Sequence, residues 1–145
     1  MKQIFIDTNV IIDFLADRRP FSEYAAILFQ LAKENKIRIY ISAISFNKTY
    51  YILRKVTSHK KALNLISEID EYVGVQETDR TILRKAIKSG FSDFEDAIQY
   101  FSAVQLGTID VIATRDIKDF KKSEIPVLSP ETTVKLLMKE NPNWF

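Results

Sequence analysis

Short apolar runs alternate along this chain with longer stretches in which apolar residues recur at helical spacing. The runs predict strands at Gln3–Ile6, Arg38–Ile41, Gly74–Glu77, Asp110–Ala113 and Pro126–Leu128. The longer stretches predict helices over Val10–Leu15, Pro20–Ala32, residues 42–56, Lys60–Tyr72, Asp79–Lys88, Ser92–Leu106 and Glu131–Glu140. Strands separated by helices favour right-handed crossovers, so we expect an α/β fold with a mainly parallel sheet and helices on both faces.

Small polar residues mark where several of these helices begin. Either Ser42 or Ser45 can cap the helix that ends near Val56. Ser92 together with Glu95 matches a capping box.

Composition narrows the class of protein. With 145 residues, three glycines and four prolines, we expect one domain spanning residues 1–145, without a flexible linker. No apolar run approaches the roughly 20 residues that a membrane-spanning helix needs, and the first residues lack a signal-peptide pattern. The absence of cysteine excludes disulfides and thiolate metal sites and fits a cytoplasmic protein. A net charge of +2 does not select a partner.

Three aspartates stand where the pattern predicts chemistry. Asp7 follows the first strand, Asp96 begins a late helix, and Asp116 follows the strand at Asp110–Ala113. Parallel strands deliver their carboxyl ends to one edge of the sheet, where ligands bind. Carboxylates gathered there repel one another unless they are protonated or bridged by a cation. The pattern therefore favours a divalent ion held by oxygen ligands, and metal-assisted hydrolysis of a phosphodiester.

These aspartates and their polar neighbours also have purely structural explanations. Asp7 alone matches a helix cap, and Asp119 alone matches a turn residue. Capping explains Ser92 and Glu95 but explains less well why three carboxylates fall within four residues. Because Asp93 and Asp96 are three residues apart on a helix, both can face one site.

Four stretches carry a resemblance to a known family. They are IFIDTNVIIDFLADR, YISAISFNKTYYILRK, FSDFEDAIQYFSAVQLGTIDVIATRDIKDF and VLSPE, and together they cover nearly the whole chain. In order and spacing they resemble PIN-domain proteins of the VapC-like kind, the toxins of prokaryotic toxin–antitoxin pairs. The resemblance implies a three-layer α/β/α sandwich and an endoribonuclease that depends on Mg²⁺ or Mn²⁺. It also implies an antitoxin partner and a homodimer.

The resemblance assigns roles to individual residues. The catalytic acids and metal ligands correspond to Asp7, Asp96 and Asp116, with Asp93 as a further metal ligand. The supporting polar groups correspond to Thr8, Asn9, Asn47, Thr114 and Asp119.

One position departs from the family. Many members carry a glutamate in the helix after the second strand, in a pattern resembling S-x-x-x-x-x-E-L. In this chain Asn47 stands in the approximate place of that acid. An amide offers an oxygen but no negative charge, and the neighbouring Lys48 adds a positive charge that opposes a second metal. Three possibilities follow: a site that binds a single metal, a nuclease with weaker activity, and a site without activity.

Basic residues near the acidic edge suggest where RNA would bind. Arg115 and Arg18 lie close to the predicted acidic edge and are the predicted RNA contacts, although a solvated surface is the ordinary explanation of such charges. The single histidine, His59, fits a surface or capping position rather than a catalytic one.

Three functions remain after these observations. The first is a metal-dependent endoribonuclease acting as a toxin, and the second is a PIN fold that binds RNA or protein without cleaving it. The third is a phosphotransfer enzyme with Asp7 as nucleophile. That chemistry calls for a second aspartate two residues further on, where this chain has Asn9.

Overall fold

Five parallel strands form one sheet in the order β3-β2-β1-β4-β5, in a computed structural model that describes all 145 residues. The strands are β1 (Gln3–Ile6), β2 (Arg38–Ser42), β3 (Gly74–Gln76), β4 (Val111–Ala113) and β5 (Val127–Leu128). In β1, Ile4 is paired with Ile39 of β2 on one side and with Val111 of β4 on the other. The first strand therefore lies at the centre of the sheet.

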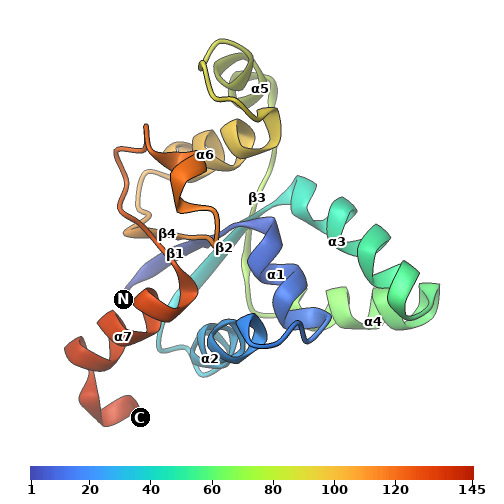
Figure 1. The fold of residues 1–145 in the computed structure, drawn as a ribbon, viewed down its shortest axis with the longest axis vertical. Coiled ribbons are helices and arrows are strands. Elements are labelled where there is room, and N and C mark those ends of the chain that lie inside the picture. The colour runs from blue at the N-terminus through green and yellow to red at the C-terminus, as the bar shows by residue number, and fades with distance from the viewer.

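Helices cover both faces of this sheet (Figure 1). They are α1 (Thr8–Leu15), α2 (Phe21–Lys33), α3 (Ala43–Val56), α4 (His59–Asp70), α5 (Arg80–Ile87), α6 (Phe94–Leu106) and α7 (Pro130–Glu140). Two short 3₁₀ helices, η1 (Ile117–Phe120) and η2 (Pro142–Trp144), complete the chain. No helix is both long and apolar enough to cross a bilayer.

The side chains of β1 divide the core into two layers. Ile4 and Ile6 pack against α1, α2 and α7 on one face, whereas Phe5 packs against α6 and η1 on the other. This alternation is the period of two that a strand imposes. Trp144 of η2 packs against the first of these layers. The predicted three-layer α/β/α sandwich is confirmed.

The element boundaries differ from the predicted ones at helix starts. Ser42, not Ser45, caps α3 by accepting a hydrogen bond from the Ile44 amide. Asp93, not Ser92, caps α6, so the predicted capping box is wrong by one residue. The extended backbone of Asp93 lets its carboxylate accept from the Asp96 amide at 2.9 Å, which satisfies a free donor of the first turn.

The strand order places a crevice beside β1. From β1 the chain moves outward to β2 and β3 on one side, and it later returns to β4 and β5 on the other. Connections that leave in opposite directions open a space at the carboxyl ends of β1 and β4, where α/β proteins bind ligands. Of the predicted acids, Asp7 follows β1 and Asp116 follows β4.

Candidate active site

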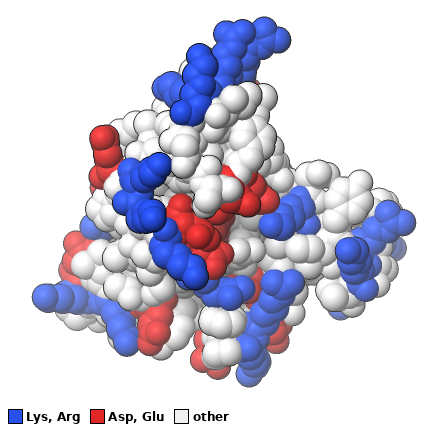
Figure 2. All heavy atoms as spheres, turned by 45° about the horizontal axis from the view of Figure 1, so that its top comes forward, with Lys and Arg blue, Asp and Glu red and all other residues white.

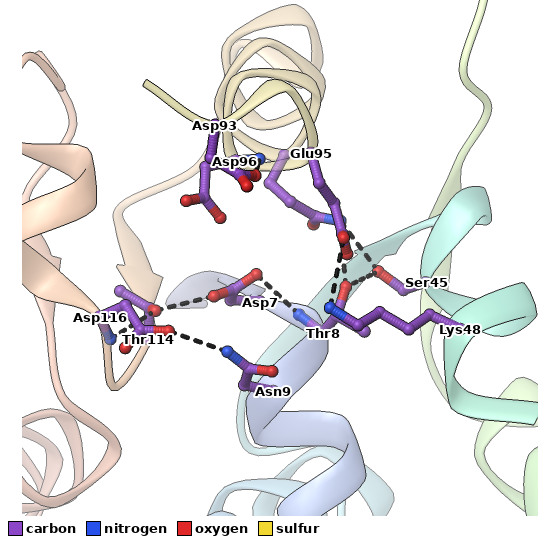
Figure 3. A network of polar contacts seen from close by, with 11 residues as sticks. Asp7, Thr8, Asn9, Ser45, Lys48, Asp93, Glu95, Asp96, Thr114 and Asp116 are labelled. Atoms are coloured by element: carbon purple, nitrogen blue, oxygen red, sulfur yellow. Dashed lines mark hydrogen bonds and ion pairs between the residues drawn. The ribbon is translucent and has the colours of Figure 1, made fainter. Parts of the chain in front are cut away.

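A polar pocket of about 190 Å³ occupies the crevice between β1 and β4. None of the residues that line it is apolar. They are Asp7, Thr8, Asn9, Lys48, Asp93, Glu95, Asp96, Asp116 and Asp119. The acidic side chains of α6 face Asp7 across this space (Figure 3). The structure thus brings together all the predicted acids, from segments that lie far apart in sequence.

Asp7 forms the buried floor of the pocket. It is only 3% exposed, and its carboxylate accepts hydrogen bonds from the Thr8 amide and the Thr114 hydroxyl, both at 2.8 Å. Burial raises the pKa of Asp7 to about 6, and the nearby charges of Asp116 and Glu95 add to the rise while the two hydrogen bonds oppose it. Asp7 also caps α1. The residue is therefore both a helix cap and part of the acidic pocket.

Thr114 and Asn9 fix the position of Asp116. The Asp116 amide donates to the Thr114 hydroxyl at 3.0 Å, and the Asn9 side-chain amide donates to the Asp116 carboxylate at 2.8 Å. Since the Thr114 hydroxyl also donates to Asp7, one oxygen atom links the loop after β4 to the end of β1. Thr8, Asn9 and Thr114 therefore lie where supporting groups were predicted.

The start of α6 contributes a concentration of negative charge. Burial raises the pKa of Asp96 to about 7, and the charges of Asp7, Asp93, Asp119 and Glu95 raise it further in that order. Asp96 is half-buried, so water screens part of this repulsion. A group of carboxylates that resist ionising together is stabilised by any cation that enters the pocket.

Lys48, not Asn47, is the residue of α3 that lines the pocket. Asn47 is exposed and outside it, whereas the Lys48 ammonium lies 3.3 Å from the Glu95 carboxylate. Lys48 shares a helix face with the buried Ser45, three residues earlier, and Asn47 points elsewhere. Counting from Ser42, the pattern S-x-x-x-x-x-E-L also places Lys48 where the family has its acid. The expectation that Asn47 occupies that place is therefore corrected.

A buried polar contact beneath the pocket was missed by sequence reasoning. The Gln99 side chain donates to the Thr8 and Ser45 hydroxyls at 3.2 and 3.1 Å, and these hydroxyls are 2.8 Å apart. The contact joins α1, α3 and α6, the helices that carry most of the pocket. The available signal was a glutamine set among the apolar residues of α6, where a polar group needs a partner.

Asp13 is a second residue that sequence reasoning missed. It is buried in α1 and accepts two hydrogen bonds from Arg115, at 2.6 and 3.1 Å, with Arg18 3.9 Å away. The Arg115 guanidinium also lies over the Phe21 ring, 4.0 Å from its centre. Arg115 is therefore engaged within the protein, and RNA contacts by Arg115 and the exposed Arg18 stay predictions. A carboxylate inside the apolar run IIDFL was the available signal.

The pocket offers oxygen donors suited to a hard cation. Carboxylate, hydroxyl and amide oxygens line it, without histidine or cysteine. No group of three or more acidic or histidine side chains is already arranged as a coordination shell. Mg²⁺ commonly keeps several of its waters and uses only one or two carboxylates, so a pocket with room for water fits such an ion.

Comparisons with known proteins agree with this geometry. Residues 3–118 match the PIN domain family. The chain is 30% identical over 135 residues to Ribonuclease VapC1 of Aquifex aeolicus (strain VF5), a match that covers 90% of this chain and 92% of that protein.

Solved structures show the same fold at low sequence identity. VapBC-1 of nontypeable Haemophilus influenzae superposes with a TM-score of 0.64 at 17% identity, covering 89% of this chain and 98% of that one. VapBC2 of Rickettsia felis, bound to a promoter DNA fragment, gives 0.63 at 18% identity, with 88% and 97% covered. VapC20 of Mycobacterium tuberculosis, a toxin that cleaves the sarcin–ricin loop, gives 0.58 at 16%, with 75% and 86% covered. With the fold, the pocket and the sequence match in agreement, the chain belongs to the PIN-domain family.

Proposed function

We propose that this protein is a metal-dependent endoribonuclease that acts as the toxin of a type II toxin–antitoxin pair. The observation that carries the proposal is the pocket at the centre of the sheet edge, where Asp7, Asp96 and Asp116 meet and two of them have raised pKa values. The names of the relatives support it, since Ribonuclease VapC1 and VapC20 are described as RNA-cleaving proteins.

The proposed roles follow from the contacts of each side chain. Asp7, Asp96 and Asp116, with Asp93, would hold Mg²⁺ or Mn²⁺. Thr114 keeps the Asp7 carboxylate oriented, and Asn9 does the same for Asp116. A bound divalent ion would supply activation of water and neutralise charge on the phosphate. Asp119, which also lines the pocket, adds negative charge that would strengthen cation binding.

Basic side chains around the pocket suit an RNA backbone. In Figure 2 acidic side chains gather in a hollow at the centre of the face, with lysines and arginines around them. Lys118, Lys121 and Lys122 line an adjacent pocket that shares Asp119 with the acidic one. On the side of Asp116, another pocket is lined by Phe21, Tyr24 and Arg115. Cations beside the acids would hold the phosphates that flank the one being cleaved.

Replacing single acids tests the enzymatic assignment. We expect Asp7→Asn and Asp96→Asn each to lower the rate of cleavage of single-stranded RNA with Mn²⁺ by at least about a hundredfold, because charge stabilisation by a metal is worth several kcal/mol. Asp70→Asn is the matched control, since Asp70 is an exposed aspartate at the end of α4 and outside the acidic pocket. Circular dichroism would establish that every variant folds. Undiminished cleavage in both pocket variants would contradict the assignment.

A second candidate function is a PIN fold that binds RNA or protein without turnover. Lys48 favours it, because a cation stands where the family pattern has an acid. If wild-type protein with Mn²⁺ leaves diverse single-stranded RNAs intact yet shifts them in a gel, this candidate replaces the first.

The biological role is a further proposal. We infer a single-domain cytoplasmic toxin, able to form a homodimer and restrained by an antitoxin. Expression of the wild type alone should stop growth, whereas Asp96→Asn should not. A small neighbouring gene whose product restores growth would identify the antitoxin.

A further inference from the structure

Lys48 is the only cation among the residues that line the acidic pocket. It reaches from α3 toward Glu95 of α6, and the two side chains meet at one end of the pocket (Figure 3). Their side chains are 46% and 36% exposed, so the pair alone would contribute little to stability. The ion pair matters for the charge that it places in the pocket, and less for the stability of the fold.

The position of this ion pair is fixed from below by buried residues. Ser45 lies one helical turn before Lys48, and Gln99 lies one turn after Glu95. Ser45 and Gln99 are fully buried and hydrogen-bonded to each other at 3.1 Å. The helices α3 and α6 are thus joined twice at matching positions, and the buried contact fixes the part of α3 that carries Lys48 beside the pocket.

We propose that the Lys48 ammonium is a built-in cation that takes the place of a second divalent ion, so that the pocket binds a single Mg²⁺ or Mn²⁺. Lys48 also holds Glu95 at one end of the pocket and so acts as a positioning residue. The inference rests on the proposed metal-dependent function.

Electrostatics explain why one ion is favoured over two. Paired catalytic metals sit about 3.5–4 Å apart and need carboxylates shared between them. Here one of the six lining carboxylates, Glu95, already has a cationic partner. A second divalent ion at that end would have to displace the ammonium or bind beside it, against repulsion that is strong at short range. An ammonium carries three N–H donors, so Lys48 has donors beyond the one given to Glu95 that can contact a phosphate oxygen.

The number of Mn²⁺ ions bound tests the proposal without relying on cleavage. Titration calorimetry, with electron paramagnetic resonance to count free Mn²⁺, should give one ion for the wild type and two for Lys48→Glu. Lys48→Met should bind its ion about tenfold more tightly, because a nearby positive charge is gone. Lys48→Arg, which keeps the charge, should match the wild type. Lys55→Glu makes the same charge change at an exposed site two turns further along α3 and should also match the wild type.

The outcomes separate the two proposals. Two ions on the wild type, or Lys48→Glu and Lys48→Met with unchanged stoichiometry and affinity, would overturn the role of Lys48 while leaving a metal-dependent nuclease intact. No Mn²⁺ binding by the wild type would overturn the proposed function itself. If Lys48→Glu fails to fold by circular dichroism, the affinity of Lys48→Met decides the question.

Discussion

The Thr114 hydroxyl sets how Asp7 and Asp116 stand relative to each other. It donates to the Asp7 carboxylate and accepts from the Asp116 amide, and it is fully buried at the end of β4. Of the two hydrogen bonds that oppose the rise in the pKa of Asp7, the one from Thr114 has the larger effect. A single oxygen atom therefore influences both the geometry and the charge of the pocket.

Replacing Thr114 with valine removes this oxygen while keeping the shape of the side chain. We expect Thr114→Val to cost about 1–3 kcal/mol of unfolding free energy, because a buried carboxylate and a backbone amide each lose a partner. The pKa of Asp7 should move up from about 6, since a hydrogen bond to the charged form is lost. Denaturant titration and carboxyl-carbon NMR would measure both. Thr114→Ser keeps the hydroxyl and should retain the wild-type pKa; a valine variant with an unchanged pKa would contradict the argument.

Individual site residues were predictable where sequence position implies spatial position, or where carboxylates concentrate in one segment, as at Asp93 and Asp96. Asp7 and Asp116 directly follow strands, and parallel strands end at one edge, so their meeting could be expected. Gln99 and Lys48 lie inside helices, and what they contact depends on how those helices are rotated and which helix lies opposite. No pattern within a single segment carries that information.

At the scale of elements, the first turn of α6 has two functions that compete. Acids there stabilise the helix by capping and by interaction with its dipole. The same acids crowd the pocket and raise the pKa of Asp96. The same negative charges therefore stabilise the helix and repel one another in the pocket.

Substitutions at Asp93 separate these two effects. Asp93→Ser keeps a capping oxygen without the charge, so we expect near wild-type stability. Asp93→Ala loses the bond to the Asp96 amide and should cost about 1 kcal/mol. In both variants the pKa of Asp96 should fall, because one neighbouring negative charge is gone. Thermal denaturation and NMR titration would test this pair; equal stability of the serine and alanine variants would show that the cap is unimportant.

The order and type of the elements followed from hydrophobic spacing, because β1, β2 and β4 are largely buried and most helices present an apolar face. The order of strands in the sheet did not follow. Nothing in the run Asp110–Ala113 indicates that β4 lies beside β1 rather than beside β3. The 3₁₀ helices were also missed, since segments this short have no periodicity to detect.

At the scale of the whole molecule, the pocket makes stability depend on pH. Asp7 and Asp96 have pKa values of about 6 and 7 in the folded chain, against 3.8 for an unperturbed aspartate. At pH values between 3.8 and about 7, Asp7 and Asp96 bind more protons in the folded chain than in the unfolded chain. The contribution of these two groups to the unfolding free energy therefore falls as pH rises from about 4 to about 7.

A comparison of wild-type and Asp96→Asn protein isolates this contribution in the metal-free state. At pH 8 we expect the variant to be more stable by roughly 1–2 kcal/mol, a value reduced from the full pKa shift because Asp96 is half-exposed. At pH 4 the two should unfold alike, since Asp96 is then protonated in the folded chain. Added Mn²⁺ at pH 8 should stabilise the wild type more than the variant. Denaturant titration at both pH values is the measurement, and a variant less stable at pH 8 would refute the argument.

The pairing of β1 with β4 also bears on when the pocket is completed during synthesis. Asn9 and Asp116 meet across the pocket although 107 positions separate them in the chain. During translation β1 emerges early and can pair with β4 only after the residues between the two strands have been synthesised. The pocket is complete only after Asp116 has left the ribosome. Under the proposed function, the growing chain therefore cannot cleave the messenger or ribosome that produces it before that point.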